Sequence, residues 1–229
     1  MVAFIAGIVR GFSGFGGPAV MILCLVPFYS PVSVLSKVAM IDLSANIKLL
    51  PSTWNEVNWH TTGWFVATAV VGIPIGMYAL NTVDPIIMKR VIAGVAACGT
   101  VVMLIGWRLT RMPPLWVTIV VSFAAGIILG ATMIAFVAVV YLLLTPAPAA
   151  ETRANIVYWG FPTTVLLIVY HAGSGNIVWN DVWLIAVICL VHLGGTIAGA
   201  RAFRLVSEVD YRRTVLWFLL GLAVLGLLL

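Results

Sequence analysis

Long apolar runs are the feature that most constrains what this chain can fold into. A helix needs about 20 consecutive apolar residues to cross the hydrocarbon core of a bilayer. Runs of about this length or longer cover residues 1–28, 32–50, 61–80, 86–107, 115–145, 152–172, 182–203 and 212–229. Only 8% of the residues are charged, against roughly 25% in a soluble domain. The sequence therefore predicts an all-α polytopic membrane protein of about eight segments, surrounded by the lipid bilayer.

Charge and reactive residues argue against other classes of protein. The net charge of +5 comes from basic residues placed between apolar runs, which is typical of the positive-inside topology signal. We therefore expect no nucleic-acid partner. The cysteines and histidines are scattered and form no CxxC or HExxH motif, so we expect no metal, no cofactor and no enzymatic activity. These six residues are Cys24, Cys98, Cys189, His60, His171 and His192.

The two halves of the chain resemble each other. Gly7 and Gly11 match Gly126 and Gly130 at an offset of 119 residues, and NEVNW, ending at Trp59, resembles GNIVW, 120 residues later. GIPIG at 72–76 and GTIAG at 195–199 correspond more loosely. We therefore predict two homologous four-segment repeats, residues 1–108 and 115–229, joined by a basic linker at 109–114 within one membrane domain. Internal repeats of this kind recur in secondary transporters.

The orientation of the repeats is left open by the basic residues. If all eight segments cross, Lys48 lies on the side opposite Arg201 and Arg204. If segments 1–28 and 115–145 are instead broken or re-entrant, the halves are inverted. Only Lys89 and Arg90 then fall on the less basic side. These two segments are each near 30 residues, which is long for one straight span.

The first segment contains GFSGFGGP, from Gly11 to Pro18. Glycine and proline disfavour the interior of a helix, and a broken helix in a membrane is tolerated only where it is buried in protein or lines a wet cavity. A helix restarting near Pro18 would present free N–H groups and partial positive charge to an anion. The alternative for the spaced pairs, such as Gly7 with Gly11, is close helix packing of the GxxxG type. A GxGxxA dinucleotide fingerprint is rejected, because no strand–turn–helix unit surrounds it.

Polar residues inside the apolar runs supply the other candidates. Charge within a span is expensive, so it usually faces the protein interior, paired or functional. Asp42 is expected either to pair with a cation or to carry a coupling proton, and Lys48 either to snorkel or to face the interior. The candidate ligands of an anion are Arg10, Ser13, Gly14, Phe15, Gly16, Gly17, Thr132, Tyr141 and Tyr158. The candidates for ion pairing or coupling are Asp42, Lys37, Asn46 and Arg153.

With these residues, the chain resembles the TauE/SafE family of membrane transporters. The motifs that carry the resemblance are GIVRGFSGFGGPAV, VNWHTTGWFVATAVVGIPIGMYAL, FAAGIILG, ETRANIVYWG and GGTIAGARAFRLVSEVDYRR. The resemblance implies a secondary transporter, of exporter type, for small sulfur-containing anions such as sulfite, sulfoacetate or related organosulfonates. It also implies a multi-pass location in the bacterial cytoplasmic membrane.

One departure from the family concerns the second half. Relatives typically carry a glycine-rich stretch where this chain has Met133, Ala135, Phe136 and Val137. We therefore expect an asymmetric site. The alternatives are a transporter of another small organic anion and a membrane-embedded accessory subunit. GxxxG surfaces are also compatible with a homodimer.

Overall fold

The fold is described from a computed structural model, which covers residues 1–104, 109–177 and 182–207 and the single residues 210, 211, 214, 217 and 221. Regular secondary structure in this part of the chain is entirely helical. The α-helices are α1 (Val2–Ser13), α2 (Gly17–Leu25), α3 (Pro31–Thr53), α4 (Trp59–Thr82), α5 (Pro85–Leu104), α6 (Leu115–Thr132), α7 (Phe136–Leu144), α8 (Ala149–Gly173) and α9 (Val182–Phe203), with a short 3-10 turn, η1 (Trp54–Glu56).

The described residues of the first seven predicted segments lie mainly in helices. The eighth, 212–229, lies outside the described residues apart from isolated positions. In the described part of the chain, α4, α6, α8 and residues Trp183–Phe203 of α9 are long and apolar enough to cross a bilayer, and α1 is a shorter apolar helix. An all-helical protein with several such spans is a multi-pass membrane protein.

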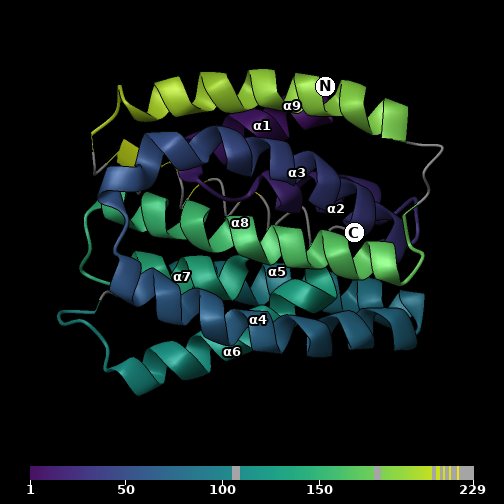
Figure 1. The fold of residues 1–229 in the computed structure, drawn as a ribbon, viewed down its shortest axis with the longest axis horizontal. Helices are drawn as coiled ribbons and strands as arrows, with labels where there is room; N and C mark the ends of the chain where they lie inside the picture. Colours follow the sequence, from purple (N-terminus) through teal and green to yellow (C-terminus); the bar gives the residue numbers. More distant parts are fainter. Residues whose placement is uncertain are drawn as a thin grey trace.

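The helices run roughly along one axis of the molecule (Figure 1). Helices α1 and α9 pack together at one edge, α4 and α6 pack together at the opposite edge, and α3 and α8 lie between them. In each pair, a helix from one half of the chain contacts a helix from the other half. The centre of the protein is therefore built jointly by both halves.

The first and fifth predicted segments each consist of two helices separated by a break. Helix α2 packs back along α1, where Gly17 approaches the side chain of Arg10 and the carbonyl of Ala6. In the second half, the N–H of Leu109 donates to the carbonyl of Leu144 at 2.9 Å. The stretch of chain before α6 therefore lies beside the end of α7, so this part of the chain folds back on itself.

Glycine pairs form the contacts between the outer helices. A Cβ placed on a glycine of α1 would overlap a main-chain oxygen of α9, and glycines of α9 meet α1 in the same way. Helices α4 and α6 approach each other by the same reciprocal arrangement. The glycines involved are Gly7, Gly11, Gly195 and Gly199 for the first pair of helices, and Gly72, Gly76, Gly126 and Gly130 for the second. The packing interpretation of these GxxxG pairs is confirmed.

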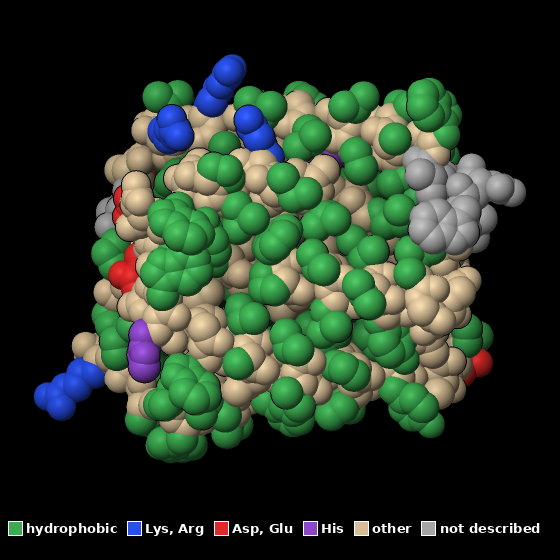
Figure 2. Space-filling view, in the orientation of Figure 1, with side chains coloured by type: hydrophobic (Ala, Val, Ile, Leu, Met, Phe, Trp, Pro, Cys, Tyr) green, Lys and Arg blue, Asp and Glu red, His purple; other side chains and the backbone are tan. Residues whose placement is uncertain are grey.

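The surface has the distribution expected of a protein immersed in lipid. Large apolar side chains such as Leu190, Tyr78 and Val71 are more than half exposed. On the face shown in Figure 2, hydrophobic side chains cover the middle, whereas charged side chains lie mainly toward the ends of the helices. Exposed apolar area on this scale is stable only when lipid or another apolar surface covers it.

Candidate functional site

Two helix breaks define the site. The first lies between α1 and α2, where Gly14 and Gly16 adopt left-handed φ angles of 81° and 82°. The second lies between α6 and α7, where Met133 has a φ of 55°. A left-handed conformation favours glycine because it has no Cβ. The break predicted at Gly11–Pro18 is therefore present, with the chain reversing at residues 14 to 16.

A side-chain hydroxyl makes the same pair of main-chain hydrogen bonds at each break. The Ser13 Oγ accepts from the N–H of Phe15 at 3.2 Å and donates to the carbonyl of Val9 at 2.8 Å. The Thr132 Oγ1 accepts from the N–H of Ile134 at 3.1 Å and donates to the carbonyl of Ile128 at 2.8 Å. These hydroxyls are 119 residues apart, the same offset as the paired glycines. Both residues therefore stabilise main chain near the site.

The second half also has a helix break, although it lacks the glycine-rich stretch of the first half. Helix α7 begins at Phe136 after a left-handed Met133, although no glycine is present. A non-glycine residue in this conformation costs about 1–3 kcal/mol, and the surrounding bundle imposes it here. The asymmetry lies in the side chains instead, because Leu129 occupies the position that matches Arg10.

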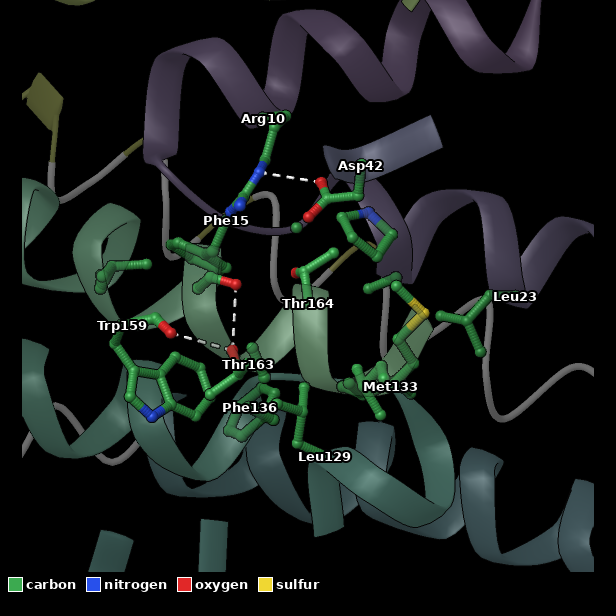
Figure 3. Close-up of a pocket in the computed structure, with 18 residues that line it drawn as sticks. Arg10, Phe15, Leu23, Asp42, Leu129, Met133, Phe136, Trp159, Thr163 and Thr164 are labelled. Atoms are coloured by element: carbon green, nitrogen blue, oxygen red, sulfur yellow. Dashed lines mark hydrogen bonds and ion pairs between the residues drawn. The ribbon is translucent and has the colours of Figure 1, made fainter. Parts of the chain in front are cut away.

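A buried cavity of about 50 Å³ lies between the two breaks (Figure 3). This volume accommodates a few water molecules. Its polar side chains are Arg10, Asp42, Thr163 and Thr164. Apolar groups and main chain form the remaining walls: Phe15, Gly16, Pro18, Ala19, Leu23, Leu129, Met133, Ile134, Ala135, Phe136, Ile156, Trp159, Gly160 and Leu167.

The amino ends of two helices meet at this cavity. Gly16 caps α2 and Ala135 caps α7, and both residues line the cavity. The first N–H groups of a helix have no partner within that helix, and its amino end carries about half a unit of positive charge. Pro18, in the first turn of α2, has no N–H to satisfy. The main chain thus presents donors and positive potential from both halves of the protein.

Arg10 is held at the edge of the cavity by one ion pair and two hydrogen bonds. Its side chain is 5% exposed, and its Nε lies 2.9 Å from Asp42 Oδ1. The Nε–H makes no hydrogen bond, so this contact is an ion pair defined by distance. One terminal nitrogen donates to Asn46 Oδ1 at 2.6 Å and the other to the carbonyl of Gly14. Asn46 also donates to Asp42 Oδ2 at 2.9 Å, which ties the three side chains into one cluster.

Arg153 has a structural position on the other side of this break. Its Nε donates to the carbonyl of Phe12 at 3.2 Å and a terminal nitrogen donates to that of Gly11 at 2.6 Å. The Tyr211 hydroxyl donates to the next carbonyl, that of Ser13, at 3.0 Å. The last carbonyls of a helix have no partner within it, and side-chain donors supply those partners here. Arg153 stabilises the end of α1 and does not line the cavity.

Other predicted ligands lie elsewhere. The hydroxyl of Tyr141 is 2.5 Å from that of Thr118, and its ring stacks on Phe65. Tyr158 donates to the carbonyl of Leu50 at 2.9 Å, within an aromatic group that includes Trp54 and Trp59. Neither tyrosine lines the cavity, and Lys37, half-buried on α3, does not line it either.

Thr163, Thr164 and Gly160, all on α8, line the cavity and were not predicted as ligands. Thr163 donates to the carbonyls of Trp159 and Gly160, and Thr164 lies 3.4 Å from Asn46 Nδ2. Gly160 allows close approach, since a Cβ there would lie 3.2 Å from both Arg10 and Asn46. Gly160, Thr163 and Thr164 flank Pro162 in α8. Proline disfavours the interior of a helix, so Pro162 marks this region in the sequence.

The second, larger hollow is a basic groove. It has a volume of about 800 Å³ and lies between α3, α8 and α9. Four cationic side chains and one acidic side chain line it: Lys48, Arg153, Arg201, Arg204 and Glu56. Asp42 on α3 lines the cavity, and Lys48, less than two turns further along the same helix, lines the basic groove.

Comparisons with known proteins identify the family. No curated protein and no solved structure matched the chain. A family profile described as Sulfite exporter TauE/SafE matches residues 1–226, nearly the whole sequence. The helix breaks, the cavity and the apolar spans described above therefore belong to a membrane transporter of the sulfite exporter TauE/SafE family.

Proposed function

We propose that this chain is a secondary transporter that exports small sulfur-containing anions, either sulfite or organosulfonates such as sulfoacetate, across the bacterial cytoplasmic membrane. One observation carries the proposal. Two helix amino ends and the Arg10 guanidinium converge on a single buried cavity. Positive potential from helix ends, with a guanidinium beside them, favours a small oxyanion.

The lining of the cavity has a polar part and an apolar part. A sulfonate presents charge-sharing oxygens that suit the guanidinium of Arg10, main-chain N–H groups and the hydroxyl of Thr164. The aromatic and aliphatic walls, including Phe15, Phe136 and Trp159, suit the short carbon chain of an organosulfonate. A carboxylate would meet the same donors, so another small organic anion is the competing substrate class.

The arrangement of the halves supports an alternating-access transporter. We propose that the halves are inverted repeats, with α1–α2 and α6–α7 as the re-entrant hairpins. Lys48 lines the same groove as Arg201 and Arg204, as the inverted arrangement requires. The groove would gather anions on the basic side of the membrane, which the positive-inside tendency assigns to the cytoplasm.

Efflux from proteoliposomes tests the proposal. Vesicles containing purified protein are loaded with radiolabelled sulfoacetate, sulfite or a dicarboxylate of similar size, and efflux is followed over time. We expect efflux of at least one sulfur anion, and a fall of at least tenfold in Arg10→Gln. That fall corresponds to loss of one hydrogen bond from a charged donor, about 1.5–3 kcal/mol.

Arg111→Gln is the matched control, because Arg111 is also cationic but is exposed before α6. It should retain wild-type efflux. Efflux of the dicarboxylate alone would replace the sulfur assignment with the competing class. No efflux of any of the three anions, or wild-type efflux in Arg10→Gln, would overturn the proposed site.

A further inference from the structure

His192 lies near the Arg10–Asp42 pair. It is fully buried on α9 and does not line the cavity. A Cβ placed on Gly17 would lie 3.3 Å from His192 Nε2 and 2.8 Å from Arg10 Cβ. The imidazole and the arginine therefore meet at the amino end of α2, where the main chain turns toward the cavity.

Neither ring nitrogen of His192 has a hydrogen-bond partner among the described residues. A buried polar group without a partner destabilises the fold, so native proteins rarely leave one without a reason. The main chain of His192 is engaged differently, since its carbonyl accepts from the Thr196 hydroxyl at 2.9 Å. The ring is thus positioned by packing while both of its nitrogens are left unused.

Two charged groups in the described part of the chain face this ring. They are Asp42, on α3, and Arg10, on α1. Helix α2 contains no ionisable side chain except Cys24, but its amino end adds partial positive charge beside the ring. With His192 neutral, the cluster of Arg10, Asp42 and His192 has no net charge.

We propose that His192 binds the proton that accompanies the transported anion. This inference rests on the proposed function. An anion entering the cavity adds one negative charge to a cluster whose positive and negative members cancel, and an uncompensated buried charge is very unfavourable. Transfer of one proton from solution to an imidazole nitrogen supplies the missing positive charge. Anion binding and proton binding therefore favour each other by the same factor.

Asp42 is the other group that could take the proton. Its carboxylate is already engaged, with Arg10 on one oxygen and with Asn46 on the other. Protonating it would break an existing ion pair, whereas protonating His192 provides a donor to a ring whose nitrogens have no partner in the described structure. Histidine is also the side chain whose ordinary titration falls between pH 5 and 8.

The test measures proton uptake during anion binding. Ethanesulfonate is the probe, because it carries a single charge and stays ionised throughout this pH range. Calorimetric titration of purified wild-type protein in buffers of different ionisation enthalpy gives the number of protons taken up per anion. We expect uptake approaching one proton at some pH between 5 and 8, and affinity that falls by up to about tenfold per pH unit as the pH rises.

The comparison of variants assigns the proton to His192. His192→Gln should bind the anion with less than twofold change in affinity across this range and with no proton uptake. His171→Gln is the matched control, since His171 is also buried but lies at the far end of α8. It should behave as the wild type. Wild-type proton uptake persisting in His192→Gln would overturn the proposal and point to Asp42.

The wild-type titration also covers the case in which His192→Gln does not fold. Anion binding without proton uptake at any pH in the range would overturn the role of His192 while leaving the transporter proposal intact. Failure to bind ethanesulfonate or any of the three anions of the efflux assay would overturn both.

Discussion

Arg10 has two roles that a double-mutant cycle can separate. It is the cation expected to bind the substrate, and it is the partner of a carboxylate that is 3% exposed. Arg10→Gln removes both roles and leaves Asp42 as an unpaired charge. The double variant Arg10→Gln/Asp42→Asn removes the substrate ligand but leaves no buried charge behind.

The magnitudes follow from the burial of the pair. Removing one member of a buried ion pair typically costs 3–5 kcal/mol, whereas replacing both members with neutral groups is often close to neutral. We therefore expect Arg10→Gln to lower the free energy of unfolding by about 3–5 kcal/mol. The double variant should recover most of that loss, since Asn46 can still hydrogen-bond to both new amides.

Unfolding by sodium dodecyl sulfate in mixed micelles gives the stabilities, and calorimetric titration with ethanesulfonate gives the affinities. The double variant should be nearly as stable as the wild type yet bind the anion at least tenfold more weakly, the loss expected for one hydrogen bond from a charged donor. Wild-type affinity in the stable double variant would refute the assignment of Arg10 as a ligand. Equal stabilities of the single and double variants would refute the energetic coupling of the pair.

Three further predictions concern the framework around the site. Gly76→Leu should lower the free energy of unfolding by about 1–3 kcal/mol or more, because the new side chain would collide with the main chain of α6. Gly63 lies on the same helix, and a Cβ there would have no atom within 4 Å. Gly63→Ala should therefore be neutral or stabilising in the same assay. Ser13→Ala and Thr132→Ala should each lower the free energy of unfolding by about 1–3 kcal/mol, since each leaves a buried N–H unpaired. A loss of stability in only one of the two variants would contradict their equivalent roles. Tyr158→Phe should retain wild-type efflux, because its hydroxyl bonds to a main-chain carbonyl away from the cavity, and a large loss would place Tyr158 on the transport route.

The sequence predicts the first helix break more fully than the second. Between Gly11 and Pro18 the glycines and the proline oppose a continuous helix, so local propensity and the fold agree. At Met133 local propensity favours a helix, and packing of the bundle overrides it. Only the repeat, which matches Thr132 with Ser13, connects the second break to the first.

The sequence also predicted part of the candidate site. Arg10, Asp42 and Asn46 stood out because polar groups are rare in apolar spans, and the structure brings them into one cluster. The same criterion selected Tyr141, which packs away from the cavity. It did not select His192, because its importance depends on the nearness of α9 to α1, which no local pattern reveals.

Anomalous diffraction from crystals soaked with 2-bromoethanesulfonate tests the central claim most directly. The account predicts a bromine peak among the apolar walls near Phe136 and Trp159, with sulfonate density against Arg10 and the amino ends of α2 and α7. A peak confined to the basic groove around Arg201, with the cavity holding only water at saturating probe, would contradict it.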